Sequence, residues 1–176
     1  KLGKRVVVVI VATKYNIHNI EATINFIRNL GINEIMLNRY NIGGTSVEDI
    51  DNILISEKEL KDLYKMADKI CGETDIKIFT SVCTPFCVLD YSEYKYLKLT
   101  SCTQRIDDVQ ALLDMNGNIR ICNHSPVVLG NIFKESWSEI VNSEQLKKWQ
   151  IKPKQCQNCN IFDRCKGGCR AASEQT

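Results

Sequence analysis

Four cysteines lie within fourteen residues near the C-terminal end of the chain, in the segment CQNCNIFDRCKGGC over 156–169. They are separated by two, five and three residues. The segment also contains Gln, Asn, Asp, Arg and Lys, so it is too polar to bury four separate thiols in a hydrophobic core. In a reducing compartment, clustered thiols are more often metal ligands than disulfide partners. The segment therefore predicts a metal centre that constrains the local fold.

The whole chain has nine cysteines, and this odd count, without an export signal, argues against a disulfide framework. Thiolates are soft ligands that suit iron–sulfur clusters, zinc or Cu(I). Cys156, Cys159 and Cys165 are close enough in sequence for one loop to wrap a cluster. Cys169 follows Gly167 and Gly168, where the backbone can turn sharply toward a second centre. A structural zinc site is the alternative, since four closely spaced cysteines often bind zinc.

Composition limits the classes of partner. The chain has 176 residues and a net charge of +2, which gives no electrostatic case for a nucleic-acid partner. The longest apolar run, VVVVIVA at 6–12, is far shorter than the roughly 20 residues of a membrane helix. It is also short for a secretory signal, and no cleavage site follows it. We therefore expect a cytoplasmic protein without nucleic-acid or membrane partners.

The first ninety residues alternate strand and helix signals. Strands are predicted at 5–12, 32–40 and 76–82, with a loop over 41–55. Helices are predicted over 17–30 and from the capping box Ser56/Glu59 to Gly72, which is expected to close the helix. This order predicts a parallel sheet with right-handed crossovers. Three strands do not close a barrel, so we expect either a piece of a larger barrel whose first part is missing, or a small open sheet covered by the second half.

The second half shows different signals. Asn116-Gly117 lies between two apolar runs over 109–122 and predicts a hairpin with a type I′ turn, with Cys122 on the return strand. One or two short helices are predicted over 134–149, the first with a capping box at Ser136/Glu139. Trp137 and Trp149 are expected in the core. The lysines at 147, 148, 152 and 154 are expected on a solvated face.

The cysteines as a set resemble a known pattern. Cys102 is followed by fourteen residues, Gly117, four residues and Cys122, before the cysteine-rich segment at 156–169. This resembles the SPASM auxiliary-cluster region of radical S-adenosylmethionine (SAM) enzymes, over roughly residues 83–176, with six of that region's seven cysteines matched. The resemblance implies an α/β fold. Residues 1–90 would be the later strands and helices of a partial (β/α) barrel, and 91–176 a SPASM domain with a hairpin, short helices and cysteine-rich loops.

The same resemblance implies metal ligands. Cys102, Cys122 and Cys169 would hold one auxiliary [4Fe-4S] cluster, completed by an upstream cysteine, Cys87 in preference to Cys83. Cys156, Cys159 and Cys165 would hold a second cluster. The usual fourth ligand of that cluster is absent, which implies either a cysteine beyond Thr176 or an iron open to substrate or solvent. His124 is expected in a turn, with a role as ligand or as hydrogen-bond donor to sulfur as the alternative.

The resemblance also implies an activity. The family's SAM-cleaving motif, C-x3-C-x2-C, is absent, so the chain alone is not expected to cleave SAM. The parent enzyme would be an oxidoreductase that modifies a peptide or protein, with SAM and a further [4Fe-4S] cluster. Its partners would be that substrate, the missing N-terminal barrel portion, and an electron donor such as a flavodoxin or ferredoxin. Asn38 and Arg39, at a strand end, would face SAM or substrate, although a structural salt bridge suits Arg39 equally well. The alternative function is a zinc-binding structural or peptide-docking module.

Overall fold

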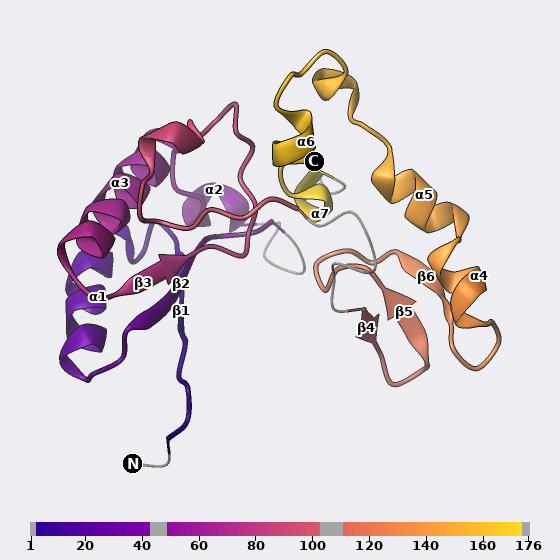
Figure 1. Ribbon diagram of the computed structural model, residues 1–176, viewed down its shortest axis with the longest axis horizontal. Coiled ribbons are helices and arrows are strands. Elements are labelled where there is room, and N and C mark those ends of the chain that lie inside the picture. Colours follow the sequence, from indigo (N-terminus) through magenta and orange to yellow (C-terminus); the bar gives the residue numbers. More distant parts are fainter. Residues whose placement is uncertain (1–2, 43–48, 103–110, 174–176) are drawn as a thin grey trace. The chain divides into compact units, whose positions relative to one another are not determined.

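The computed structural model describes residues 3–42, 49–102 and 111–173. The chain forms two packed units, Lys1–Thr100 and Ser101–Thr176, each with its own buried core (Figure 1). The first is a parallel sheet with helices, and the second is an antiparallel sheet with short helices and loops. None of the helices in the described ranges is both long enough and apolar enough to cross a membrane.

The sheet of the first unit has the order β1-β2-β3, from β1 (Val8–Ala12), β2 (Glu34–Arg39) and β3 (Lys77–Phe79). Both strand pairs are parallel, with Ile10 beside Leu37 and Ile35 beside Ile78. The prediction of a parallel sheet is therefore confirmed, although each strand is shorter than expected. A single bridge between Phe79 and Lys98 extends the sheet beyond β3.

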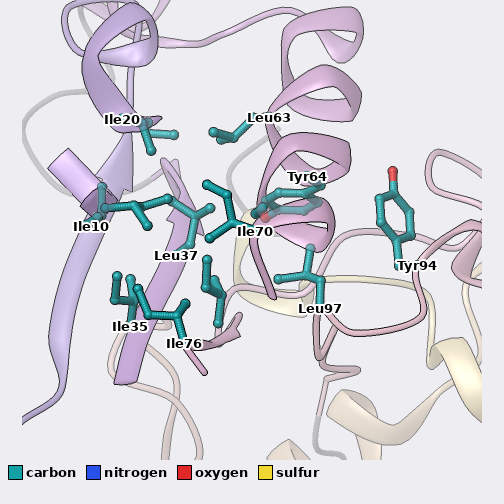
Figure 2. Packing of buried hydrophobic residues seen from close by; sticks show 14 of the residues in the cluster. Ile10, Ile20, Ile35, Leu37, Leu63, Tyr64, Ile70, Ile76, Tyr94 and Leu97 are labelled. Atoms are coloured by element: carbon teal, nitrogen blue, oxygen red, sulfur yellow. The ribbon is translucent and has the colours of Figure 1, made fainter. Parts of the chain in front are cut away.

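Helices α1 (Ile20–Asn29) and α3 (Glu57–Glu73) lie on one side of this sheet (Figure 1). Their apolar faces meet the strands in one core, where Leu37, Tyr64 and Ile70 point toward one another (Figure 2). Along β1 the side chains alternate, so Ile10 and Ala12 are buried while their neighbours Val9 and Val11 are 56% and 41% exposed. Strand β1 therefore buries one of its faces.

The connections are short helical turns. The 3-10 helix η1 (Ile17–Asn19) leads into α1, and α2 (Ile50–Ile53) precedes α3. The loop expected over 41–55 thus contains a helical turn, and its residues 43–48 lie outside the described ranges.

Helix α3 begins as predicted and ends differently. Ser56 Oγ accepts a hydrogen bond from the Glu59 backbone N–H at 3.2 Å, and Glu59 Oε2 accepts one from the Ser56 N–H at 2.7 Å. The helix continues through Gly72 to Glu73, so the expectation that Gly72 closes it is wrong. A Cβ at Gly72 would lie 2.7 Å from Cε2 of Tyr96, so the glycine makes room for a packed ring.

That ring belongs to a segment that packs with the first unit. The 3-10 helix η3 (Tyr91–Glu93) opens the segment. Asp68 Oδ1 on α3 accepts hydrogen bonds from the backbone N–H groups of Tyr96 and Leu97, at 2.7 and 2.8 Å. Tyr94 and Leu97 are buried in the same core (Figure 2). The packed unit therefore extends to Thr100, past the expected division between 1–90 and 91–176.

The sheet of the second unit contains β4 (Leu112–Leu113), β5 (Asn118–Arg120) and β6 (Val128–Asn131), all antiparallel. Short helical elements follow: α4 (Trp137–Val141), α5 (Glu144–Gln150), η5 (Lys154–Cys156), α6 (Phe162–Cys165) and α7 (Arg170–Ser173). The capping box at Ser136/Glu139 is present, and Trp149 is buried, as predicted. Trp137 is 53% exposed, so its predicted core position is wrong: it begins α4, whose buried residue is Ile140.

The hairpin is confirmed, but its turn type is not. The Asp114 N–H donates to the Asn118 carbonyl at 3.0 Å, which closes a three-residue loop, and Gly117 has φ of +80°. Asn116 has a negative φ, whereas a type I′ turn needs positive φ at both central residues. Asp114 Oδ1 accepts the Asn116 and Asn118 N–H groups and so stabilises this longer loop. Cys122 lies two residues beyond β5, and positions 109–110 of the predicted hairpin lie outside the described ranges.

Candidate metal centre

Three cysteines from distant parts of the sequence lie at the core of the second unit. Cys102 lies at the start of the unit, Cys122 follows β5, and Cys169 immediately precedes α7. All three are half-buried and pack against the same cluster of buried apolar residues. The charges of Cys102 and Cys169 both act to raise the pKa of Cys122. Three of the seven cysteines predicted as ligands therefore pack against one core.

Some of the groups around Cys122 raise the pKa of its thiol and others lower it. Burial is the largest effect and raises the pKa of the thiol, and the neighbouring cysteines raise it further. The backbone N–H of His124 points at Cys122 Sγ from 3.4 Å, and hydrogen bonds from the backbones of His124 and Ser125 lower the pKa. His124 lies in a turn, as expected, and it contacts Cys122 through its backbone N–H. Cysteines that oppose one another's ionisation favour a bound metal cation, whose charge stabilises the thiolates.

The other three cysteines of the cysteine-rich segment form a separate loop. Cys156 ends η5, and its carbonyl accepts a hydrogen bond from the Cys159 N–H at 3.0 Å. Cys165 ends α6, and its N–H donates to the Ile161 carbonyl at 3.0 Å. Cys156 and Cys159 are half-buried and Cys165 is buried. Consecutive tight turns thus bring these three thiols onto one short stretch of chain.

A left-handed turn separates this loop from Cys169. Lys166, Gly167 and Gly168 all have positive φ, at 58°, 81° and 78°. Two of these residues are glycines, which adopt this conformation without a steric penalty. A Cβ at Gly167 would also lie only 3.2 Å from Cγ of Pro153. The predicted sharp turn is therefore present, and Cys169 beyond it packs against the core together with Cys102 and Cys122.

The two upstream cysteines differ in exposure. Cys83 is buried, with 7% of its surface exposed, and its Sγ lies 3.9 Å from the Ser81 carbonyl oxygen. Cys87 is exposed, in a turn where the Pro85 carbonyl accepts hydrogen bonds from the N–H groups of Val88 and Leu89. Both belong to the first unit. Cys87 is thus the more accessible of the two thiols.

Asn38 and Arg39 hold the loop that follows β3. Asn38 is buried, and its side chain accepts hydrogen bonds from the N–H groups of Ser81 and Val82 and donates to Ser81 Oγ. Arg39 Nη2 donates to the Cys83 carbonyl at 3.0 Å, and Nε donates to Thr84 Oγ1 at 3.3 Å. No salt bridge involving Arg39 occurs within the described ranges. The sequence did not predict these hydrogen-bond partners, which lie more than forty positions away.

The guanidinium of Arg39 also acts on Tyr64 in the core. Burial raises the pKa of Tyr64 to about 12, while the nearby charge of Arg39 acts to lower it. The phenol therefore stays protonated at neutral pH. The contacts of Asn38 and Arg39 tie β2 to the loop after β3, at the carboxyl end of the sheet.

The donor set of the second unit fits a sulfur-rich group. The six cysteines offer only soft thiol ligands. Trp149 Nε1 and Arg120 Nε are buried donors without a hydrogen-bond acceptor, and the sulfur atoms of an iron–sulfur cluster are acceptors. Over residues 3–42, 49–102 and 111–173, no three Cys, His, Asp or Glu side chains are arranged around a single metal ion.

Comparison with known proteins bears on this site directly. Residues 102–165 match the SPASM family, an iron–sulfur cluster-binding domain. No curated protein matches the chain significantly. Among solved structures, native anSMEcpe with bound AdoMet matches with a TM-score of 0.57 and 15% identity, over 93% of this chain and 46% of that one. The complex of anSMEcpe with AdoMet and the Cp18Cys peptide matches with a TM-score of 0.58 and 14% identity, over 93% and 47%.

This chain therefore spans about half the length of the solved structures that it matches. These structures are of a radical SAM anaerobic sulfatase maturase that contains a SPASM domain. The match begins at Cys102, next to the division between the two packed units at Ser101. Residues 102–165 thus match a SPASM iron–sulfur cluster-binding domain, and the chain as a whole shares the fold of about half of anSMEcpe.

Proposed function

We propose that the chain is the auxiliary-cluster part of a radical SAM enzyme that modifies a peptide or protein, and that it binds two [4Fe-4S] clusters. One observation carries the proposal. Cys102, Cys122 and Cys169 pack on one core, whereas Cys156, Cys159 and Cys165 lie in a loop on the other side of a left-handed turn. Two sets of thiols in two local environments support two centres.

The first centre would be held by Cys102, Cys122, Cys169 and Cys87. The exposure of Cys87 supports its choice over the buried Cys83. The backbone N–H groups of His124 and Ser125 would hydrogen-bond to the Cys122 thiolate and offset part of its negative charge. When bound, the clusters would supply one-electron transfer or a binding position for substrate.

The second centre would be held by Cys156, Cys159 and Cys165. Because the matched segment supplies three thiols to it, the fourth position belongs to another cysteine, to solvent or to substrate. The turn at Lys166–Gly168 keeps Cys169 out of this loop, which supports its assignment to the first centre.

The remaining activity belongs to the larger enzyme. It would bind SAM and a further [4Fe-4S] cluster through parts that this sequence lacks, since C-x3-C-x2-C is absent from it. Residues 1–90 would be part of its barrel, and the exposed Val9 and Val11 on β1 support further strands there, because parallel sheets are normally buried on both faces. Asn38 and Arg39 would lie on the SAM side.

We also propose the partners of that enzyme. The solved structures bound to AdoMet and to the Cp18Cys or Kp18Cys peptides support a peptide substrate. A flavodoxin or ferredoxin would exchange electrons with the clusters, and the compartment would be the cytoplasm.

Separate cysteine variants test the two-centre assignment. After anaerobic reconstitution, Cys122→Ala and Cys165→Ala should each retain about half of the wild-type iron and sulfide, because each removes a ligand of a different cluster. The double variant should retain almost none. Cys71→Ala is the control, since this helix cysteine is in neither set. Loss of all iron in either single variant would show that the six thiols serve one shared centre.

A further inference from the structure

One of the two tryptophans of the chain is buried in the second unit without a partner for its indole N–H. Trp149, on α5, is 6% exposed, and among the described residues no acceptor lies within hydrogen-bond distance of its Nε1. A buried donor that has lost water without gaining another acceptor destabilises the folded chain, so nearly all such donors in native proteins have a partner. The N–H of Trp149 therefore indicates an acceptor other than the described residues of the chain.

The other tryptophan provides a contrast. Trp137 begins α4 and is 53% exposed, so its indole N–H can donate to water. Burial thus leaves only one of the two indole groups in need of an acceptor. Because the sequence contains no further tryptophan, Trp137 is a matched control for Trp149.

Trp149 belongs to the apolar core against which Cys102, Cys122 and Cys169 pack. Within this cluster of side chains, the sulfur atoms of the three cysteines are the hydrogen-bond acceptors. The core therefore places a donor that lacks an acceptor in the same apolar environment as the proposed ligands of the first centre. The other buried members of the core are aliphatic: Ile119, Ile121, Leu129, Ile140, Leu146 and Ala171.

The chemical state of a sulfur atom decides how well it accepts a hydrogen bond. A thiol sulfur is a weak acceptor, whereas the thiolates and sulfides around iron carry negative charge, and hydrogen bonds to charged acceptors are about twice as strong. The low dielectric constant of a buried core strengthens such a bond further. The buried N–H of Trp149 is therefore better matched to a metal-bound sulfur than to a thiol.

We propose that the indole N–H of Trp149 donates a hydrogen bond to a sulfur of the cluster at Cys102, Cys122 and Cys169, and that it raises the reduction potential of this cluster. The inference rests on the proposed first centre and adds to it a residue outside the cysteine pattern. On reduction, one electron passes from an external donor to the cluster, and no atom or proton is transferred. The added electron makes the sulfurs more negative, so the N–H stabilises the reduced cluster more than the oxidised one.

Replacing the indole N–H by sulfur tests the donor while keeping the shape of the side chain. In a Trp137→Phe chain, biosynthetic exchange of tryptophan for benzothienylalanine alters position 149 alone. Every sample also carries Cys165→Ala, so that an anaerobic redox titration followed by electron paramagnetic resonance reports the first centre. The equilibrium constant for reduction should fall about tenfold on loss of the N–H, which corresponds to a potential about 59 mV lower for one electron. Trp137→Phe alone should leave this constant within about twofold of that of the chain with both tryptophans.

A second measurement uses the reconstituted wild-type chain with ¹⁵N-labelled tryptophan. The indole N–H signal of Trp149 should shift between the oxidised and the reduced chain, because a proton bonded to a cluster sulfur senses the unpaired electrons, and the signal of Trp137 should not. This comparison decides the matter where either replacement prevents iron binding. In samples that hold iron and sulfide, equal potentials with and without the N–H, or a Trp149 signal that ignores reduction, would overturn this inference alone. Absence of iron from every sample, wild type included, would contradict the proposed clusters and this inference with them.

Discussion

Burial decides what each of the two upstream cysteines can do. Cys83 is enclosed in the first unit, and the carbonyl beside it accepts a hydrogen bond from Arg39. Cys87 lies four residues later on an exposed turn. A thiol in the first position behaves as a small apolar side chain, whereas one in the second is free to serve as a ligand. Sequence spacing alone favours Cys87 weakly, and its exposure strengthens that choice.

Replacing each of these two cysteines by alanine in turn tests which one is the fourth ligand of the first centre. Cys87→Ala should lower the iron content of the reconstituted chain and leave the urea unfolding of the first unit unchanged. Cys83→Ala should keep the iron and destabilise that unit by about 1 kcal/mol, because it removes a buried sulfur. Iron lost in Cys83→Ala and kept in Cys87→Ala would show that the choice of Cys87 is wrong.

Gly117 is the residue at which the hairpin of the second unit is most constrained. Its φ is +80°, and a Cβ there would lie 2.4 Å from Cδ2 of Phe133. Gly117→Ala should therefore destabilise the second unit by about 1–3 kcal/mol, the sum of backbone strain and the clash with the ring. Chemical denaturation followed by circular dichroism measures this loss.

A double-mutant cycle separates the two causes. In a Phe133→Ala background the ring is absent, so Gly117→Ala should destabilise the second unit only through backbone strain, by about 1–2 kcal/mol. An equal loss in both backgrounds would mean that the Phe133 ring does not constrain this position.

Helix starts are the elements that the sequence specifies best, because their signals are local. The pairs Ser56/Glu59 and Ser136/Glu139 both form capping boxes in the structure. The end of α3 could not be predicted in the same way, because it depends on a distant residue. Gly72 leaves space for the ring of Tyr96, which lies 24 residues later in the chain. The turn type of the hairpin also escaped prediction, since the Asp114 side chain stabilises a longer loop.

The capping box of α3 predicts a pH-dependent contribution to stability. Hydrogen bonds from the Ser56 hydroxyl and backbone lower the pKa of Glu59 below its usual value. Because the folded pKa is lowered, this contribution is present above the unfolded pKa of about 4.3 and is lost as pH falls through the folded value. Wild type should be more stable than Glu59→Gln at pH 7, and the difference should shrink at pH 3.

Urea unfolding of both proteins at the two pH values measures this difference. Ser56→Ala provides the control, since it removes a cap worth about 1 kcal/mol at pH 7 and should abolish most of the pH dependence of the comparison. A difference between wild type and Glu59→Gln that grows at low pH would contradict the assignment.

For the molecule as a whole, the sequence predicted the order of elements better than their packing. Apolar periodicity gave the parallel sheet and its two long helices, and the spacing of the cysteines gave the SPASM domain that the family match confirms. The strand β6, the exposure of Trp137 and the inclusion of 91–100 in the first unit depend on contacts between distant residues. Of the site, Cys102, Cys122 and Cys169 pack against one core, and their role as ligands stays a prediction.

The central claim is that this chain holds two iron–sulfur clusters. Anaerobic purification followed by analysis of iron, sulfide and zinc, together with a visible absorption spectrum, tests it most directly. We expect a brown protein with about eight irons and eight sulfides per chain, as two [4Fe-4S] clusters require. A colourless protein with stoichiometric zinc and no sulfide would contradict the claim.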